Sequence, residues 1–214
     1  MLITLNEDNS YKKVRWISFR KFALDNSLEL LEVNNMKDVE EYIKLNDIKY
    51  DIFFEVGWSY LIPKTIFSIA SLGAYGFHPS LLPQGKGTGL IGGVINGYDK
   101  WGASLFKLEE DFDNGEVVGH AHFTININDD IKTLYDKAED SYISLFHNLI
   151  QPILDKKIVQ IENKMIESRY PRRVPDDGEI NWSRSNTSLK LYNFIRAQSH
   201  PYPGAFTHLN NKKL

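Results

Sequence analysis

Short apolar runs alternate along this chain with segments whose apolar residues recur at every third or fourth position. The first pattern predicts strands and the second predicts amphipathic helices. In the first half we expect strands at residues 1–4, 28–33, 50–58 and 74–78, and helices at 16–24, 36–45 and 62–73. Strands that alternate with helices favour a mainly parallel sheet, which is the doubly wound, Rossmann-like α/β class.

The second half continues the alternation and contains the strongest helical pattern. Apolar residues follow a period of three to four from residue 129 to 154, and Asp129 and Asp130 suit the N-terminus of such a helix. We expect further helices at 87–95 and 188–199, and strands at 101–109, 116–125 and 158–161. The strand at 101–109 should carry Ala103, Leu105 and Lys107 on one face. The predicted domains are a core over 1–185 and a short helical C-terminal extension over 186–214.

Composition and charge narrow the class of protein. The chain is 42% hydrophobic and 25% charged, with a formal charge of −3. This balance gives no reason to expect a nucleic-acid partner, although YPRR at 170–173 could form a local basic patch. Cysteine is absent, which excludes disulfides and thiolate sites. Neither a signal peptide nor a membrane-spanning run is evident, so we expect a cytoplasmic protein without membrane partners.

The segment GFHPSLLPQGKG, residues 76–87, concentrates residues of special chemistry. His78 follows a predicted buried strand and precedes Pro79, and ligands of open α/β sheets bind beyond the carboxyl ends of strands. A histidine there can titrate near neutral pH, but a structural role is the alternative. The glycines and Lys86 could cradle a phosphate, yet the spacing fits neither the P-loop nor the dinucleotide fingerprint.

A second such segment, EEDFDNGEVV, places Asp113 one β-α-β excursion after His78. That separation allows the carboxylate to meet the imidazole, raise its pKa and favour imidazolium, as a general acid or oxyanion stabiliser requires. The alternative is that Asp113-Asn114-Gly115 is only a hairpin turn. His120 and His122 share one strand face but have no evident third ligand, so we expect no metal site.

Taken in order, these motifs resemble the folate-dependent formyltransferases. GFHPSLLPQGKG is similar to the family signature N-x-HPSLLP, and DFDNGEVV is similar to its D-x-G segment. YDIFFEVGWSYLIPKTI resembles its pterin-holding strand and loop, and GEINWS, IRA and PYPGAFT resemble the end of its catalytic domain. The likeness spans nearly the whole chain.

The resemblance implies roles for particular residues. His78 and Asp113 match the catalytic pair, and the implied co-substrate is 10-formyltetrahydrofolate, with no metal. Residues implied to bind the folate are Trp58, Tyr60, Leu61, Ile62, Asp111 and Gly115. Residues implied to bind the acceptor are Gly76, Phe77, Ser80, Lys86, Gly87 and Thr88.

Two departures from the family pattern qualify these roles. Gly76 stands where the family has an asparagine that aids the formyl oxygen, although a branch with GFHP among surface-sugar biosynthesis proteins resembles this chain. The first strand, helix and phosphate loop of the family have no obvious counterpart. These departures leave open a non-catalytic folate- or nucleotide-binding homologue, whereas the intact His78 and Asp113 favour an enzyme.

The expected acceptor is a nucleotide-linked amino sugar, such as a dTDP-4-amino-4,6-dideoxyhexose of O-antigen lipopolysaccharide. Methionyl-tRNA is less expected, because the formyltransferases that act on it carry an additional basic, nucleic-acid-binding barrel. Glycinamide ribonucleotide is also less expected, because the loop that binds its phosphate belongs to the N-terminal strand and helix that have no obvious counterpart here. The apolar HPYPGAF segment, residues 200–206, could pack on a second subunit, so we expect a homodimer. An unrelated α/β nucleotide-binding enzyme would require the motif order to be coincidental.

Overall fold

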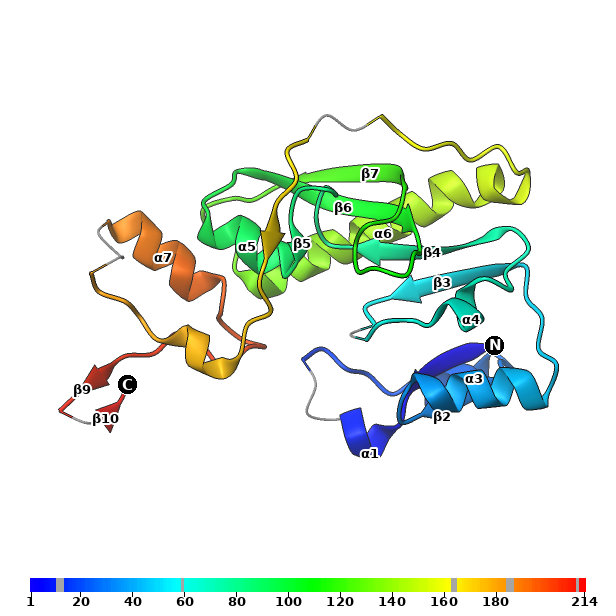
Figure 1. Ribbon diagram of the computed structural model, residues 1–214. Helices are drawn as coiled ribbons and strands as arrows, with labels where there is room; N and C mark the ends of the chain where they lie inside the picture. The colour runs from blue at the N-terminus through cyan, green and yellow to red at the C-terminus, as the bar shows by residue number, and fades with distance from the viewer. Residues whose placement is uncertain (11–13, 59, 163–164, 184–186, 211) are drawn as a thin grey trace. The chain divides into compact units, whose positions relative to one another are not determined.

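The structure is a computed structural model that describes residues 1–10, 14–58, 60–162, 165–183, 187–210 and 212–214. The chain, drawn in Figure 1, divides into two compact units. Unit 1 comprises Met1–Phe53 and Ser59–Gly73, and unit 2 comprises Phe54–Trp58 and Ala74–Leu214.

Unit 1 contains two parallel strands and short helices. Strand β1 (Leu2–Leu5) pairs in parallel with β2 (Leu30–Val33), and α1 (Glu7–Ser10) and α2 (Arg20–Asp25) lie between them in sequence. Helix α3 (Met36–Leu45) begins where the Asn35 side chain accepts a hydrogen bond from the Lys37 N–H. Val39 and Ile43, one turn apart on α3, are buried, as the predicted amphipathic pattern requires.

Two predicted helices of this half are shorter in the structure. The helix predicted at 16–24 begins only at Arg20, and the one predicted at 62–73 is reduced to α4 (Lys64–Phe67). The Ser71 and Leu72 N–H groups donate to the carbonyls of Tyr50 and Asp51 instead of to a preceding helical turn, and the Ser71 hydroxyl donates to the Asp51 carboxylate. The segment after α4 therefore leaves the helix although its apolar spacing continues.

Unit 2 is built on a sheet with strand order β3-β4-β6-β7, of which β3 (Ile52–Val56) contributes its last three residues to this unit. Strand β4 is Gly73–His78, β6 is Lys100–Lys107 and β7 is Val117–Thr124. The arrows of β3 and β4 point the same way, whereas β6 pairs antiparallel with both β4 and β7 (Figure 1). The Rossmann-like α/β class is confirmed, with an antiparallel β6 that the sequence pattern did not predict.

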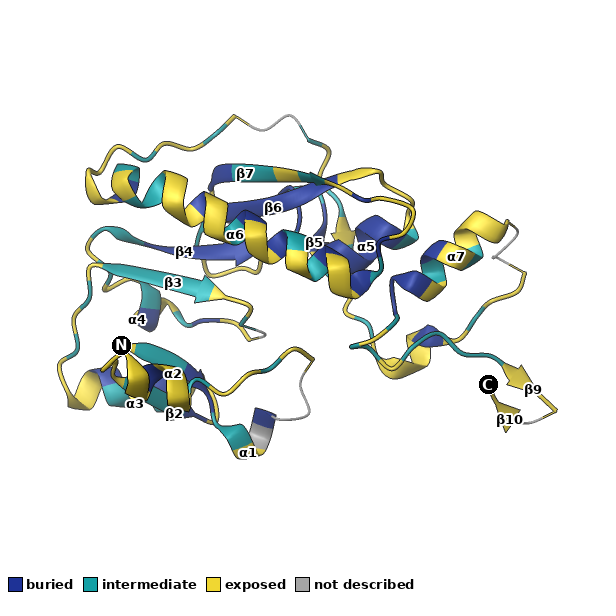
Figure 2. Cartoon of the chain, turned by 180° about the vertical axis from the view of Figure 1, so that it is seen from behind, coloured by how far each residue is buried: buried dark blue, intermediate teal, exposed yellow. Residues whose placement is uncertain are grey.

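Helices α5 (Gly89–Ile95) and α6 (Ile131–Leu154) supply the apolar core of unit 2. The core cluster joins both helices to β6 through Leu90, Ile91, Val94, Trp101, Ile125, Ile131, Leu134 and Ala197. Figure 2 shows α6 along the sheet with its exposed residues facing outwards. The residues of β6 from 101 to 106 are all buried, because the strand lies between two others and beneath α6. The alternation along this strand therefore does not mark a solvent-exposed face.

The C-terminal part carries α7 (Ser188–Arg196), which confirms the predicted short helix, and the two-residue strands β9 (His208–Leu209) and β10 (Lys212–Lys213). Strand β5 (Lys86–Gly87) pairs in parallel with β8 (Arg169–Tyr170), followed by a 3₁₀ turn at Pro175–Gly178. No strand forms at 158–161, where a strand was expected; the Ile161 N–H donates only to the Val117 carbonyl. The predicted boundary at residue 185 lies outside the described residues.

Candidate active site

The end of β4 brings His78 to the position where the strand enters the loop of residues 79–88. Ser104, which lies opposite His78 on β6, fixes this loop: its hydroxyl donates to the Ser80 carbonyl at 2.6 Å and accepts from the Leu82 N–H at 2.9 Å. The Trp101 indole donates to the Pro79 carbonyl at 2.9 Å. A buried serine inside an apolar strand was the signal in the sequence that could have identified this anchor.

His78 and Asp113 meet in the structure, as the spacing of the two motifs predicted. Nδ1 of His78 lies 3.4 Å from Oδ1 of Asp113, and both side chains are largely buried. The other ring nitrogen, Nε2, lies 3.1 Å from the Gly85 carbonyl, which can only accept, so Nε2 carries a proton. Asp113 reaches the ring because residues 108–116, between β6 and β7, form a long connection rather than a tight hairpin.

Burial changes the expected electrostatics of this pair. Burial lowers the pKa of His78 below its ordinary value, and this effect outweighs the opposing influence of Asp113 and of the Gly85 carbonyl. The expectation that Asp113 raises the pKa of His78 overall was therefore wrong. The imidazolium loses more hydration free energy on burial than its attraction to one carboxylate restores. Protonation of His78 therefore depends strongly on the negative charge that develops on a bound reactant.

Asp113 is held by a second contact on the opposite side of its carboxylate. Its Oδ2 accepts from the Gly87 N–H at 2.8 Å. Gly87 has φ +78° and lies against the Tyr170 carbonyl, where any Cβ would collide with that oxygen. The glycine at this position therefore allows the loop backbone to approach both the carboxylate and β8.

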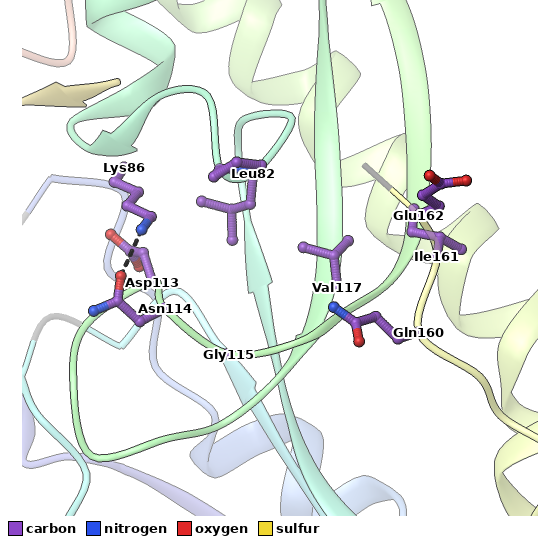
Figure 3. A pocket seen from close by; sticks show the side chains of 10 residues that line it. Leu82, Lys86, Asp113, Asn114, Gly115, Val117, Gln160, Ile161 and Glu162 are labelled. Atoms are coloured by element: carbon purple, nitrogen blue, oxygen red, sulfur yellow. Dashed lines mark hydrogen bonds between the residues drawn. The ribbon is translucent and has the colours of Figure 1, made fainter. Parts of the chain in front are cut away.

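A cavity of about 550 Å³ opens beside Asp113 (Figure 3). The turn at 113–115 and Lys86 lie on one side of it, and residues 160–162 lie on the other. The apolar part of the lining comes from Leu82, Pro83, Val117 and Ile161. The cavity thus brings Gly115, expected to bind the folate, together with Lys86, expected to bind the acceptor.

Glu55 is a half-buried carboxyl of this region that the sequence reasoning missed. It lies on β3, and its carboxylate accepts a hydrogen bond from the Trp58 N–H. Burial raises its pKa to about 7, the Trp58 N–H opposes this, and the negative charge of Asp113 adds to it. The acidic residue within the apolar run IFFEV was the signal that could have singled it out.

The remaining expected acceptor residues are placed differently from one another. Phe77 is buried, with its ring 5.1 Å from that of Tyr142, and Ser80 is fully buried. The Thr88 hydroxyl donates to the Pro171 carbonyl at 2.7 Å. A Cβ on Gly76 would lie 2.9 Å from the side chains of Phe106 and Leu108, so an asparagine would not fit there without displacement. Direct acceptor contacts from these residues stay predictions.

Of the expected folate residues, Trp58 belongs to unit 2 and is partly buried, whereas Asp111 is exposed on the 108–116 connection. Tyr60, Leu61 and Ile62 belong to unit 1. Tyr60 and Leu61 line a cavity of unit 1 beside the start of α3, and Ile62 is buried. Their contact with a folate stays a prediction.

Two further features bear on the class of protein. Within the described residues no group of three or more acidic or histidine side chains could hold a metal ion. No helix in the described part of the chain is long and apolar enough to cross a membrane. A Rossmann-like sheet with a buried His/Asp pair at a strand end beside a cavity is a candidate active site.

Comparison with known proteins identifies the family. The profile of the formyl transferase domain matches residues 5–150, and that of the formyl transferase C-terminal domain matches residues 173–214. The chain therefore belongs to the formyl transferase family, as its motifs suggested.

Two curated relatives extend the likeness. The bifunctional polymyxin resistance protein ArnA of Wigglesworthia glossinidia brevipalpis is 29% identical over 215 residues, covering 100% of this chain and 33% of that protein. The methionyl-tRNA formyltransferase of Fusobacterium nucleatum subsp. nucleatum is 30% identical over 202 residues, covering 93% of this chain and 64% of that protein. The chain thus spans less than two thirds of either relative.

Solved structures share the fold at lower identity. A 4-N formyltransferase from Francisella tularensis has a TM-score of 0.76 at 18% identity, covering 99% of this chain and 94% of that one. WlaRD, a sugar 3N-formyl transferase crystallised in the presence of dTDP and 5-N-formyl-THF, has a TM-score of 0.72 at 23% identity, covering 99% and 73%.

Proposed function

We propose that this protein transfers a formyl group from 10-formyltetrahydrofolate to the amine of a nucleotide-linked amino sugar. The contact between His78 Nδ1 and Asp113 Oδ1 carries the proposal, because it joins the two residues that the family resemblance assigns to the reaction. Family membership supports the formyl transfer, and the two sugar or 4-N formyltransferase structures with the same fold support the acceptor class.

In this mechanism the amine lone pair attacks the formyl carbon, and the bond from that carbon to N10 of the folate then breaks. The amine nitrogen loses one proton and N10 gains one, so protons balance. The Nε2–H of His78 turns from the Gly85 carbonyl to the formyl oxygen as it becomes negative. Asp113 faces Nδ1, stabilises the charge on the ring and accepts the proton of the amine.

The cavity beside Asp113 suits the amine-bearing reactant. Besides Asp113, its lining contains the carboxylate of Glu162 and the side-chain amides of Asn114 and Gln160. Carboxylates favour a cationic amino group in the initial complex; this group releases one proton to solvent to free its lone pair, and Asp113 is then placed to accept the second proton, which the nitrogen loses on attack. A dTDP-4-amino-4,6-dideoxyhexose for O-antigen synthesis in the cytoplasm, with a homodimeric enzyme, is the specific form of the proposal.

A panel of nucleotide-linked amino sugars, each incubated with 10-formyltetrahydrofolate and followed by mass spectrometry, tests the proposal. We expect one sugar to gain the mass of a single CO with the wild type and none with His78→Asn. If no sugar reacts while folate still binds, the protein is a binding homologue or serves another amine.

Methionyl-tRNA is the second candidate, because residues 173–214 match the C-terminal formyl transferase domain and the Fusobacterium relative carries that name. Adding charged initiator tRNA to the panel separates the two acceptors. Formylation of the tRNA alone would replace the sugar in the proposal.

A further inference from the structure

The orientation of Asp113 depends on the turn that carries it. Asp113 has φ +59°, the left-handed region that few residues other than glycine adopt. Its carboxylate must point at once to Nδ1 of His78 and to the Gly87 N–H. A left-handed residue on a long connection keeps such a direction only where its neighbours hold the backbone in place.

Lys86 holds the residue that follows Asp113. Its Nζ lies 2.5 Å from Oδ1 of Asn114 and 2.8 Å from Oε1 of Glu167 (Figure 3 shows the first of these bonds). The Lys86 side chain is only 8% exposed, whereas that of Glu167 is 65% exposed. The buried ammonium is therefore neutralised by a carboxylate at the surface and fixes the Asn114 amide of the turn.

The segment that carries Glu167 is itself bound to the loop after His78. The Gly85 and Lys86 N–H groups donate to the Ser168 carbonyl at 3.0 and 2.9 Å. Arg169, paired with Lys86 in the β5–β8 ladder, donates from Nη2 to the Phe112 carbonyl at 3.2 Å. Residues 167–170 thus contact both the loop that leads from His78 and the turn that presents Asp113.

This arrangement disfavours the role that the family resemblance suggested for Lys86. An ammonium that already contacts Glu167 and Asn114 would have to break the ion pair to bind a phosphate of the acceptor. Its bonds instead join segments that are far apart in sequence and meet at the catalytic pair.

We propose that Lys86, paired with Glu167, is a positioning residue that holds the Asp113 carboxylate against His78, and is not a contact for the acceptor. This inference rests on the proposed formyl transfer for its kinetic consequence only. The geometric consequence, the distance between Asp113 and His78, can be measured without any turnover.

The kinetic test uses Lys86→Met, which keeps the length of the stem and removes the ammonium. We expect kcat to fall about 10- to 100-fold, with KM for acceptor and donor within about twofold, because a misplaced catalytic group affects the reaction rather than binding. Lys86→Arg should recover part of kcat. A large rise in the acceptor KM with unchanged kcat would instead make Lys86 a substrate contact and overturn the proposal.

The second test measures the pKa of His78 by NMR in the protein without substrates. Asp113, the Gly85 carbonyl and Arg169 are the groups that act on this ring besides its burial. If Lys86→Met frees Asp113, we expect the pKa of His78 to fall, and the same fall is expected in Asp113→Asn because Asp113 acts to raise this pKa. The direct effect of removing a nearby cation has the opposite sign, so an unchanged or raised pKa would contradict the proposal.

Lys107→Met is the matched control. Lys107 also pairs with a carboxylate, Glu116, at 2.7 Å and lies at the start of the same connection, but its side chain is 41% exposed. We expect neither kcat nor the pKa of His78 to change. If the wild type shows no formyl transfer at all, the proposed function is refuted. The NMR measurement of the pKa of His78 would still decide the role of Lys86.

Discussion

Two buried cations of unit 2, Lys86 and Arg196, are equally shielded from solvent but are held in different ways. Lys86 contacts two side chains, Asn114 and Glu167. Arg196, at the end of α7, donates to the carbonyls of Asn126 and Asp129 at 2.8 and 2.7 Å and to Oδ1 of Asn193 at 2.9 Å.

The different partners of the two cations indicate that Lys86 supports the active site and that Arg196 supports the fold. Arg196 satisfies backbone carbonyls just before α6, so its loss leaves buried acceptors unpaired and weakens the attachment of α7. Lys86 orients a turn that carries a reacting group, so its loss should affect the rate more than the stability. The two cations show that burial alone does not reveal whether a charge serves the fold or the site.

His78→Asn should give the largest effect of all the variants. Its fall in kcat is the standard against which the fall in Lys86→Met is judged. We expect kcat to fall about 10²- to 10³-fold, because the oxyanion loses its donor. Circular dichroism and the melting temperature should stay close to the wild type. If the variant retains more than a tenth of the wild-type kcat, His78 has no catalytic role. Lys86 could then not act as a support for the His78–Asp113 pair.

Arg196→Met tests the structural side. We expect the free energy of unfolding to fall by about 3 kcal/mol, because several buried carbonyls lose a charged donor. The measurement is denaturant unfolding, and kcat of the folded protein should be unchanged. Lys132→Met, on an exposed pair with Asp136, is the control and should change stability little. A fall in kcat without loss of stability would break the comparison.

Glu55→Gln extends the comparison to a half-buried carboxyl that faces a like charge. Because the pKa of Glu55 is raised to about 7 in the folded protein, its proton is held more tightly there than in the unfolded chain. Stability is therefore greatest below the unfolded pKa and is lost as pH rises through 7. Glutamine cannot ionise, so the variant should gain about 2 kcal/mol relative to the wild type between pH 5 and pH 8. Parallel melting curves at both pH values that show no such gain would argue against a raised pKa.

Gly76→Ala should give the smallest effect, about 1 to 2 kcal/mol of stability, because its Cβ meets Phe106 and Leu108 in a packed core. Thermal unfolding measures it. Stabilisation by this substitution would show that the site has room for a Cβ, contrary to the packing around β4.

The sequence predicted the helices at 36–45 and 129–154 because each repeats its apolar period over several turns. It predicted the meeting of His78 and Asp113 from the spacing of their two motifs. It did not predict the antiparallel β6, since periodicity records which positions are apolar and not the direction in which a strand returns. Asn114, Glu167 and Arg169 were missed because a polar residue on a loop gives no local signal of a partner that lies far away in the sequence.

The direct test of the His78–Asp113 pair is a double-mutant cycle on the single-turnover rate of formyl transfer, with the acceptor that the mass-spectrometry panel identifies. His78→Asn and Asp113→Asn are measured singly and together. If the two side chains act as one unit, the double variant is about as slow as the slower single variant, and the coupling energy exceeds 1 kcal/mol. If instead the rate losses of the two single variants simply multiply in the double variant, the coupling energy is zero. The contact between His78 and Asp113 would then have no part in the reaction.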